Sequence, residues 1–102
     1  MENKIYSKYF KAFSDPTRLK IIRLLAGKEM SVNDIVAAVG LSQPTVSRHL
    51  GVLRDADVVT DRREGQQVYY GLNRESVQQC CSSFCDCLEI PVRIEIRKKK
   101  KK

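Results

Sequence analysis

The sequence predicts a small, mainly α-helical domain that carries one β-hairpin. Two observations indicate this fold class. Apolar residues recur at helical spacing over most of the chain, and β-branched and aromatic residues interrupt that pattern at residues 58–60 and 68–70. The 102 residues suffice for one domain with a single small core. Because such a core is thin, dimerisation would be a natural way to bury more apolar surface.

The first two helices are expected before residue 28. Apolar residues at helical spacing mark the first over about residues 4–13, and a second follows from Pro16 to about Gly27. Asp15 is a suitable N-cap for the second helix, and proline is favoured at a first helical position. A glycine near the end of the pattern is typical of a helix C-terminus.

A third, short helix is expected from Ser31 to Gly40, and a fourth over about residues 43–56. Ser31 has an acidic residue three positions later, which is capping-box spacing, and Ser42 can cap the fourth helix. Leu41, between the two helices, is expected to be a buried turn residue. Two short helices joined in this way form a helix-turn-helix pattern, whose second helix lies in the major groove of DNA.

The fourth helix has two different faces. At about 100° per residue, Val46, Leu50 and Leu53 form an inward stripe. The leading end and the opposite face carry the candidate DNA-binding residues Gln43, Thr45, Ser47 and Arg48. Gln43 can read adenine, and Arg48 can read guanine or hold a phosphate. The alternative is a merely solvated helix face, which is less favoured because no glutamate or lysine points outward in the first two turns.

The helical period ends with the fourth helix. Residues 58–60 and 68–70 favour strands, and Glu64-Gly65-Gln66 between them is a turn signal, so a β-hairpin is expected. Arg62 and Arg63 precede that turn. A basic hairpin directly after a DNA-reading helix fits a wing that reaches the DNA backbone or the minor groove. The alternative, an ordinary exposed turn with solvated charges, is weaker at this place in the chain.

A last helix is expected over about residues 73–89, because Asn73 can cap it and Pro91 stops it. The predicted architecture is therefore a winged helix-turn-helix with about five helices and two strands. Residues 1–91 would form this DNA-binding and dimerisation domain, and residues 92–102 a basic tail. The tail is either a disordered solubilising segment or a sequence-independent phosphate contact, and the sequence favours neither.

The charge of the chain indicates its class of partner. The net charge is +7, from 19 lysines and arginines against 12 acidic residues, which suggests a polyanion: nucleic acid or an anionic membrane surface. No lipid motif, amphipathic membrane helix, signal peptide or transmembrane pattern accompanies the charge. We therefore expect a cytoplasmic protein without a membrane role, whose thiols stay reduced.

Three segments resemble, in this order, the ArsR/SmtB family of metal-responsive repressors. Residues 13–25 resemble the second helix of that family, residues 41–50 its DNA-reading helix and residues 62–72 its wing. The resemblance covers roughly residues 5–88. It implies a homodimeric repressor bound to double-stranded operator DNA, with the first and last helices forming the dimer interface. It also implies that an inducer releases the operator.

Two of the inducer sites found in that family are not expected here. Its arsenic motif at the third helix needs two cysteines, and Ser31 and Asn33 stand at those positions. Its zinc-type site on the last helix needs histidine and carboxylate ligands. The one histidine of this chain, His49, lies on the predicted DNA-reading helix, where packing or phosphate contact is the expected role.

All four cysteines lie within eight residues of the last helix, at Cys80, Cys81, Cys85 and Cys87. One interpretation is that they are small buried hydrophobes at a dimer interface. Their concentration in one helix instead favours a sensor, and soft thiolates select soft ions. Resemblance to arsenite-responsive family members implies Cys80, Cys81 and Cys87 as ligands of trivalent arsenic or antimony. Cys85 is an additional thiol, which leaves the choice of ligands open.

The helix geometry limits how such an ion can bind. Cys80 and Cys87 lie about 10 Å apart along an intact helix. The ion must therefore unwind the helix end or recruit thiols across a dimer. A second hypothesis keeps the DNA binding and makes the same cysteines sensors of oxidants or persulfides. No obligatory cofactor is expected, and no enzyme, because the chain lacks a redox Cys-x-x-Cys, a catalytic histidine partner and a phosphate-binding glycine loop.

Overall fold

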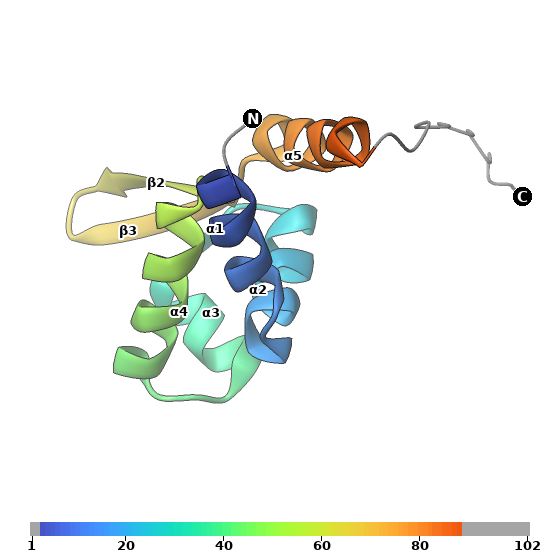
Figure 1. The fold of residues 1–102 in the computed structure, drawn as a ribbon. Coiled ribbons are helices and arrows are strands. Elements are labelled where there is room, and N and C mark those ends of the chain that lie inside the picture. Colours follow the sequence, from blue (N-terminus) through green and yellow to red (C-terminus); the bar gives the residue numbers. More distant parts are fainter. Residues whose placement is uncertain (1–2, 89–102) are drawn as a thin grey trace, which may run out of the picture.

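The computed structural model describes residues 3–88, without the side chains of residues 3–5, 86 and 87. The basic tail predicted for residues 92–102 lies outside the described residues. Within residues 3–88 there are five helices and three strands, in the order α1 (Asn3–Phe13), α2 (Pro16–Gly27), β1 (Met30–Ser31), α3 (Val32–Val39), α4 (Gln43–Asp55), β2 (Val59–Glu64), β3 (Gln67–Leu72) and α5 (Arg74–Cys87). The helices α1 to α4 pack together, the β2–β3 hairpin extends to one side, and α5 lies across the end of the body beside α1 (Figure 1).

Capping by neighbouring side chains explains where the helices begin. The carboxylate of Asp15 accepts the amide hydrogens of the second and third residues of α2, at 2.7 and 3.2 Å. The hydroxyls of Ser31 and Ser42 accept the amide hydrogen three residues later, at 3.1 and 3.4 Å. Asn73 caps α5 in the same way at 3.2 Å. Gly40 ends α3 with φ of 72°, in the left-handed region that glycine adopts without strain.

The sheet is antiparallel and has the strand order β1-β3-β2. The prediction of two strands was therefore incomplete, because Met30 pairs with Tyr70 and adds a third. This strand, β1, has two residues, too few for an alternating pattern to reveal it. Its second residue, Ser31, is also the N-cap of α3. The sheet therefore fixes the base of the hairpin to the start of the helix-turn-helix.

The core lies between the helices and the base of the sheet. Its largest fully buried side chains are Ile21, Ile35, Leu50, Leu53, Val46, Val58 and Val59. The predicted inward stripe of α4 is thus confirmed, and the opposite face of α4 is left for solvent. The expectation that Leu41 is buried was wrong, since 38% of it is exposed. Its turn lies at the end of the body farthest from α5 (Figure 1).

Aromatic contacts join α5 to α1. The Phe84 ring meets the rings of Tyr6 and Phe10 edge to face, with centroids 5.2 and 4.9 Å apart. About two turns earlier on α5, the Ser76 hydroxyl lies 2.8 Å from the Tyr9 hydroxyl. Beyond these contacts α5 projects past the helical body (Figure 1). No helix within residues 3–88 is long and apolar enough to cross a membrane.

Candidate DNA interface and cysteine cluster

The leading turns of α4 present the predicted base-reading side chains. Gln43, Ser47 and Arg48 are exposed, and Thr45 is half-buried. The Thr45 hydroxyl accepts a hydrogen bond from the Ser42 hydroxyl at 2.9 Å, so it also takes part in the helix cap. No hydrogen bond or ion pair of Arg48 is found within the described part of the chain. The leading end of α4 and its exposed side thus present an amide, two hydroxyls and the guanidinium of Arg48.

The two arginines of the wing have different surroundings. Arg62 pairs across the hairpin with Tyr69, and its guanidinium lies over the Tyr69 ring, 4.8 Å from the centroid. The same guanidinium donates to Glu29 through Nε (3.0 Å) and Nη2 (2.8 Å), and to Glu64 through Nη1 (2.9 Å). Neighbouring residues on a strand point to opposite faces, so Arg63 points away from this group. Arg63 is exposed, and no partner for it is found in the described residues.

Arg62 therefore ties together the three strands of the sheet. It starts on β2, crosses Tyr69 on β3 and ends at Glu29, just before β1. Its hydrogen bonds hold the pKa of Glu29 below the ordinary value. The ion pair is thus intact above the ordinary carboxylate pKa and is lost as pH falls through the lowered one. The prediction that Arg62 contacts DNA stays a prediction, and such a contact would compete with two carboxylates.

We expect alanine at Arg62 and at Arg63 to weaken DNA binding for different reasons. Arg63→Ala should weaken binding to all duplexes similarly, because it removes a cation that has no partner in the described residues. The slope of the logarithm of the binding constant against the logarithm of the salt concentration should fall by about one for each protomer. Arg62→Ala should instead speed amide hydrogen exchange in β2 and β3, because it removes the contact between the strands. Salt titrations and hydrogen exchange of both variants check this. Equal exchange rates in the two variants would contradict the division of roles.

The cysteines of α5 differ in exposure. Cys80 is buried, Cys81 is exposed and Cys85 is half-buried, while the Cys87 side chain lies outside the described residues. Burial raises the pKa of the Cys80 thiol, and the neighbouring Cys81 adds to this shift. In this state the Cys80 thiol therefore forms the metal-binding thiolate less readily than a thiol with the ordinary pKa. Among the side chains that the structure describes, no three of the metal-ligating kinds are grouped to hold an ion.

Helical spacing explains why Cys80 is covered. Ser76, Cys80 and Phe84 follow one another at intervals of four, which places them on one face of α5. Ser76 and Phe84 both contact α1, so Cys80 between them faces α1 as well. Cys81 and Cys85 lie on the neighbouring face, where α5 projects from the body. The structure brings three thiols to one helix and separates them between two faces.

Comparison with known proteins identifies this arrangement. The model of the family described as bacterial regulatory proteins of the arsR family matches residues 15–61. The transcriptional repressor SdpR of Bacillus subtilis is 48% identical over 69 residues, which cover 68% of this chain and 77% of SdpR. The chain belongs to the ArsR family. This ArsR-family protein is a DNA-binding transcriptional repressor and not an enzyme.

Two further relatives extend the comparison. The arsenic resistance transcriptional regulator ArsR1 of Pseudomonas putida is 46% identical over 70 residues, which cover 68% of this chain and 55% of ArsR1. Among solved structures, the homodimeric winged helix-turn-helix DNA-binding domain Mb0332 of Mycobacterium bovis superposes with a TM-score of 0.70 at 29% identity. That match covers 84% of this chain and 81% of Mb0332. The family resemblance predicted from the sequence and the winged helix-turn-helix fold are thus confirmed.

The sequence did not reveal the partners of Arg62. A two-residue turn at Gly65-Gln66 places Arg62 opposite Tyr69, so strand pairing could have found that contact. Glu29, 33 residues earlier in the chain, left no local signal. It becomes a partner only because β1 joins the sheet.

Proposed function

We propose that this ArsR-family protein binds operator DNA as a homodimer and releases it when trivalent arsenic or antimony binds thiols of α5. The leading turns of α4 and the wing would contact the DNA. The observation that carries the proposal is that all the described cysteines lie on α5, the helix that packs on α1 and projects from the body. ArsR1, a relative named for arsenic resistance, supports the choice of ion.

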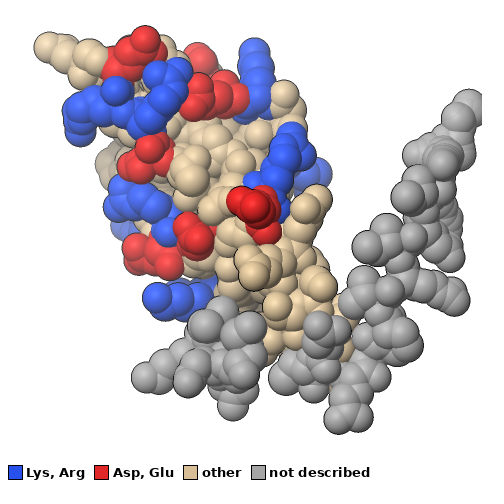
Figure 2. Space-filling model, turned by 90° about the horizontal axis from the view of Figure 1, so that it is seen from above, with Lys and Arg blue, Asp and Glu red and all other residues tan. Residues whose placement is uncertain are grey.

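The surface around α1 and α5 supports dimerisation. Phe10 and Leu88 are 49% and 50% exposed, the most among the large apolar side chains that the structure describes. In the view onto α5, uncharged surface runs from the middle of the molecule to the end of the described chain (Figure 2). Acidic and basic side chains gather mostly at the opposite end of that view. A second copy would cover this uncharged surface, and the similar Mb0332 domain is homodimeric.

The burial of Cys80 supports a mechanism of release. An ion held by Cys80 and Cys81 needs thiols from two faces of α5, and one of them lies against α1. Binding would therefore favour a state in which α5 is partly unwound or moved from α1. If α1 and α5 form the dimer interface, this state spaces the two α4 helices wrongly for DNA. The operator is released because the ion binds the wrongly spaced state more tightly.

The test uses an operator duplex selected from a random library with the wild-type protein. We expect arsenite to release this duplex from wild type, and not from Cys80→Ser, Cys81→Ser or Cys87→Ser, as measured by fluorescence anisotropy. Cys85→Ser is the matched control. If arsenite still releases the operator from this variant, Cys85 is not a required ligand. Release from all three other variants would refute the ligand assignment.

A second candidate function is sensing of oxidants or persulfides by the same helix. Exposed Cys81 and half-buried Cys85 lie one turn apart on one face, which favours reaction between them. Peroxide and polysulfide therefore form further arms of the same titration. Release by these reagents, abolished in Cys85→Ser and with no effect of arsenite, would replace the arsenic proposal.

A further inference from the structure

One side chain, Arg18 in the first turn of α2, is bonded to two other helices. Its Nε and Nη2 donate to the main-chain oxygens of Ala12 (3.1 Å) and Lys11 (2.7 Å), near the end of α1. Its Nη1 lies 3.1 Å from Nδ1 of His49 on α4. Arg18 therefore joins α1, α2 and α4 through three hydrogen bonds.

The chemistry of the two groups makes this junction specific. A guanidinium has donors and no acceptor, so Arg18 bonds to His49 only where Nδ1 offers its lone pair. The bond therefore requires the imidazole tautomer that carries its hydrogen on Nε2. The last carbonyl groups of a helix lack hydrogen-bond partners within the helix. At the end of α1, Arg18 donates to two of these carbonyl oxygens. A lysine at this position has no planar fork to make the three bonds together.

The charges around the junction reinforce it. The Asp15 carboxylate, which caps α2, accepts the Arg18 amide hydrogen at 3.2 Å. Partial burial alone would raise the pKa of Asp15, but hydrogen bonds from the amides of Arg18 and Thr17, and the nearby charge of Arg18, lower it below the ordinary value. The carboxylate, the guanidinium and the imidazole thus form one connected group at the start of α2.

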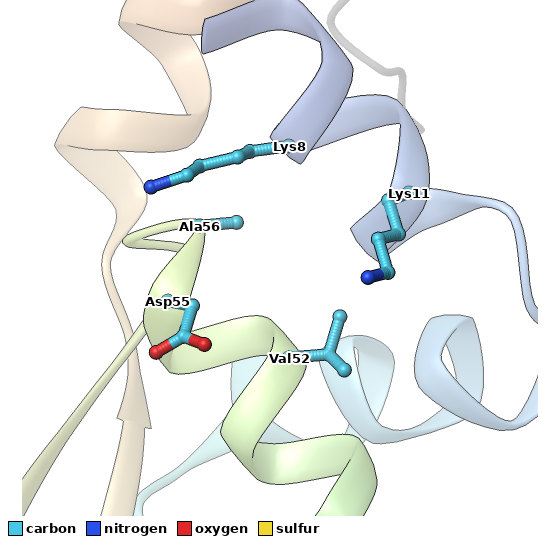
Figure 3. A pocket seen from close by; sticks show the side chains of 5 residues that line it. All are labelled: Lys8, Lys11, Val52, Asp55 and Ala56. Carbon is cyan, nitrogen blue, oxygen red and sulfur yellow. The ribbon is translucent and has the colours of Figure 1, made fainter. Parts of the chain in front are cut away.

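A pocket separates α1 from the last turn of α4. It has a volume of about 130 Å³, and the two helices face each other across it. Its lining side chains, shown in Figure 3, are Lys8, Lys11, Val52, Asp55 and Ala56. The pocket therefore leaves part of the space between α1 and the end of α4 unfilled. The polar junction at His49, one turn earlier on α4, adds a second link between these helices, through Arg18.

The junction lies between the two functional regions. On one side, α1 is held to α5 by Tyr6, Tyr9 and Phe10. On the other side, half-buried His49 lies on α4 between exposed Arg48 and buried Leu50. A displacement of α1 would therefore shift α4 at His49, the residue next to the DNA-reading Arg48.

We infer that Arg18 is a positioning residue that, through His49, sets α4 relative to α1. The inference rests on the proposed function, which assigns α4 to DNA and α1 with α5 to the dimer interface. In a dimer of this fold the two DNA-reading helices must lie about one turn of DNA apart, roughly 34–36 Å. The link between α1 and α4 would keep the two α4 helices at that spacing. A movement of α5 and α1 on inducer binding would then move α4 and lower the affinity for DNA.

The test compares His49→Leu, which removes the acceptor, with His49→Asn, whose side-chain oxygen can take the place of Nδ1. We expect His49→Leu and Arg18→Met each to weaken binding to the selected operator by about 5- to 20-fold, a coupling of ordinary size. Binding to a non-specific duplex should stay within about twofold of wild type. His49→Asn should retain operator affinity, and the double variant should bind no worse than the weaker single variant.

Arg23→Met is the matched control, because Arg23 is an exposed arginine on α2 with no bonded partner found in the described residues. Unchanged operator affinity in His49→Leu overturns the inference. Equal losses in His49→Leu and His49→Asn, or losses that multiply in the double variant, also overturn it. These results leave the proposed function intact. If wild type selects no operator at all, the proposed function fails first and the inference fails with it.

Discussion

Replacing Leu50 with alanine is expected to lower the free energy of unfolding by about 2–5 kcal/mol. Leu50 is 1% exposed and lies in the middle of the buried stripe of α4, between Val46 and Leu53. The substitution removes buried apolar atoms and leaves a cavity that the surrounding helices fill only in part. Domains have only about 5–15 kcal/mol of stability in total, so this loss should unfold a measurable fraction of the protein.

Leu19→Ala is the matched control for this prediction. Leu19 is 38% exposed on α2, so the same chemical change should cost far less than at Leu50. Urea unfolding followed by circular dichroism, at one fixed protein concentration, measures both variants. Equal midpoints for the two variants would show that α4 does not depend on its buried stripe for its place in the fold.

Replacing Arg48 with alanine is expected to weaken operator binding by roughly 10- to 100-fold without loss of stability. Arg48 is exposed on the face opposite the buried stripe and has no partner within the described residues. Its removal therefore leaves the fold intact and takes away one cation from each DNA-reading helix. If Arg48 reads guanine, base preference at one operator position should relax. If it holds a phosphate, all duplexes should lose affinity and the salt dependence should flatten.

Arg54→Ala is the control on the same helix. Arg54 donates to Asp61 at 3.0 Å, so its charge is already paired within the protein. Its pKa is raised, mainly by the hydrogen bond to Asp61. An exposed ion pair contributes little to stability, and its removal should change operator affinity far less than Arg48→Ala. Anisotropy titrations at several salt concentrations compare the two variants. An Arg48→Ala protein that binds its operator as wild type does would remove Arg48 from the interface.

Helix boundaries and helix faces followed from the sequence because they depend on residues a few positions apart. Asp15, Ser31 and Ser42 cap the helices after them with bonds that span two or three residues. The buried stripe of α4 follows from the helical period. The turn at Gly65, with φ of 64°, is similarly local. These local signals sufficed to predict the helix-turn-helix, the hairpin and the face of α4 that carries Arg48.

Contacts between distant segments were decided only by the tertiary structure. Arg62 reaches Glu29 across 33 residues, and Arg18 reaches His49 across 31. The charge pattern of the sequence does not predict Glu29 or His49 as the partner, because any other exposed side-chain acceptor fits the pattern equally well until the chain is folded. The burial of Cys80 and the exposure of Cys81 depend likewise on how α5 packs on α1, at contacts such as Tyr9 to Ser76 across 67 residues. The sequence by itself determined which residues could read DNA and which could bind soft ions. The pairing of β1 with the hairpin decided that Arg62 is bonded to Glu29, and the packing of α5 on α1 decided that Cys80 is buried while Cys81 is exposed.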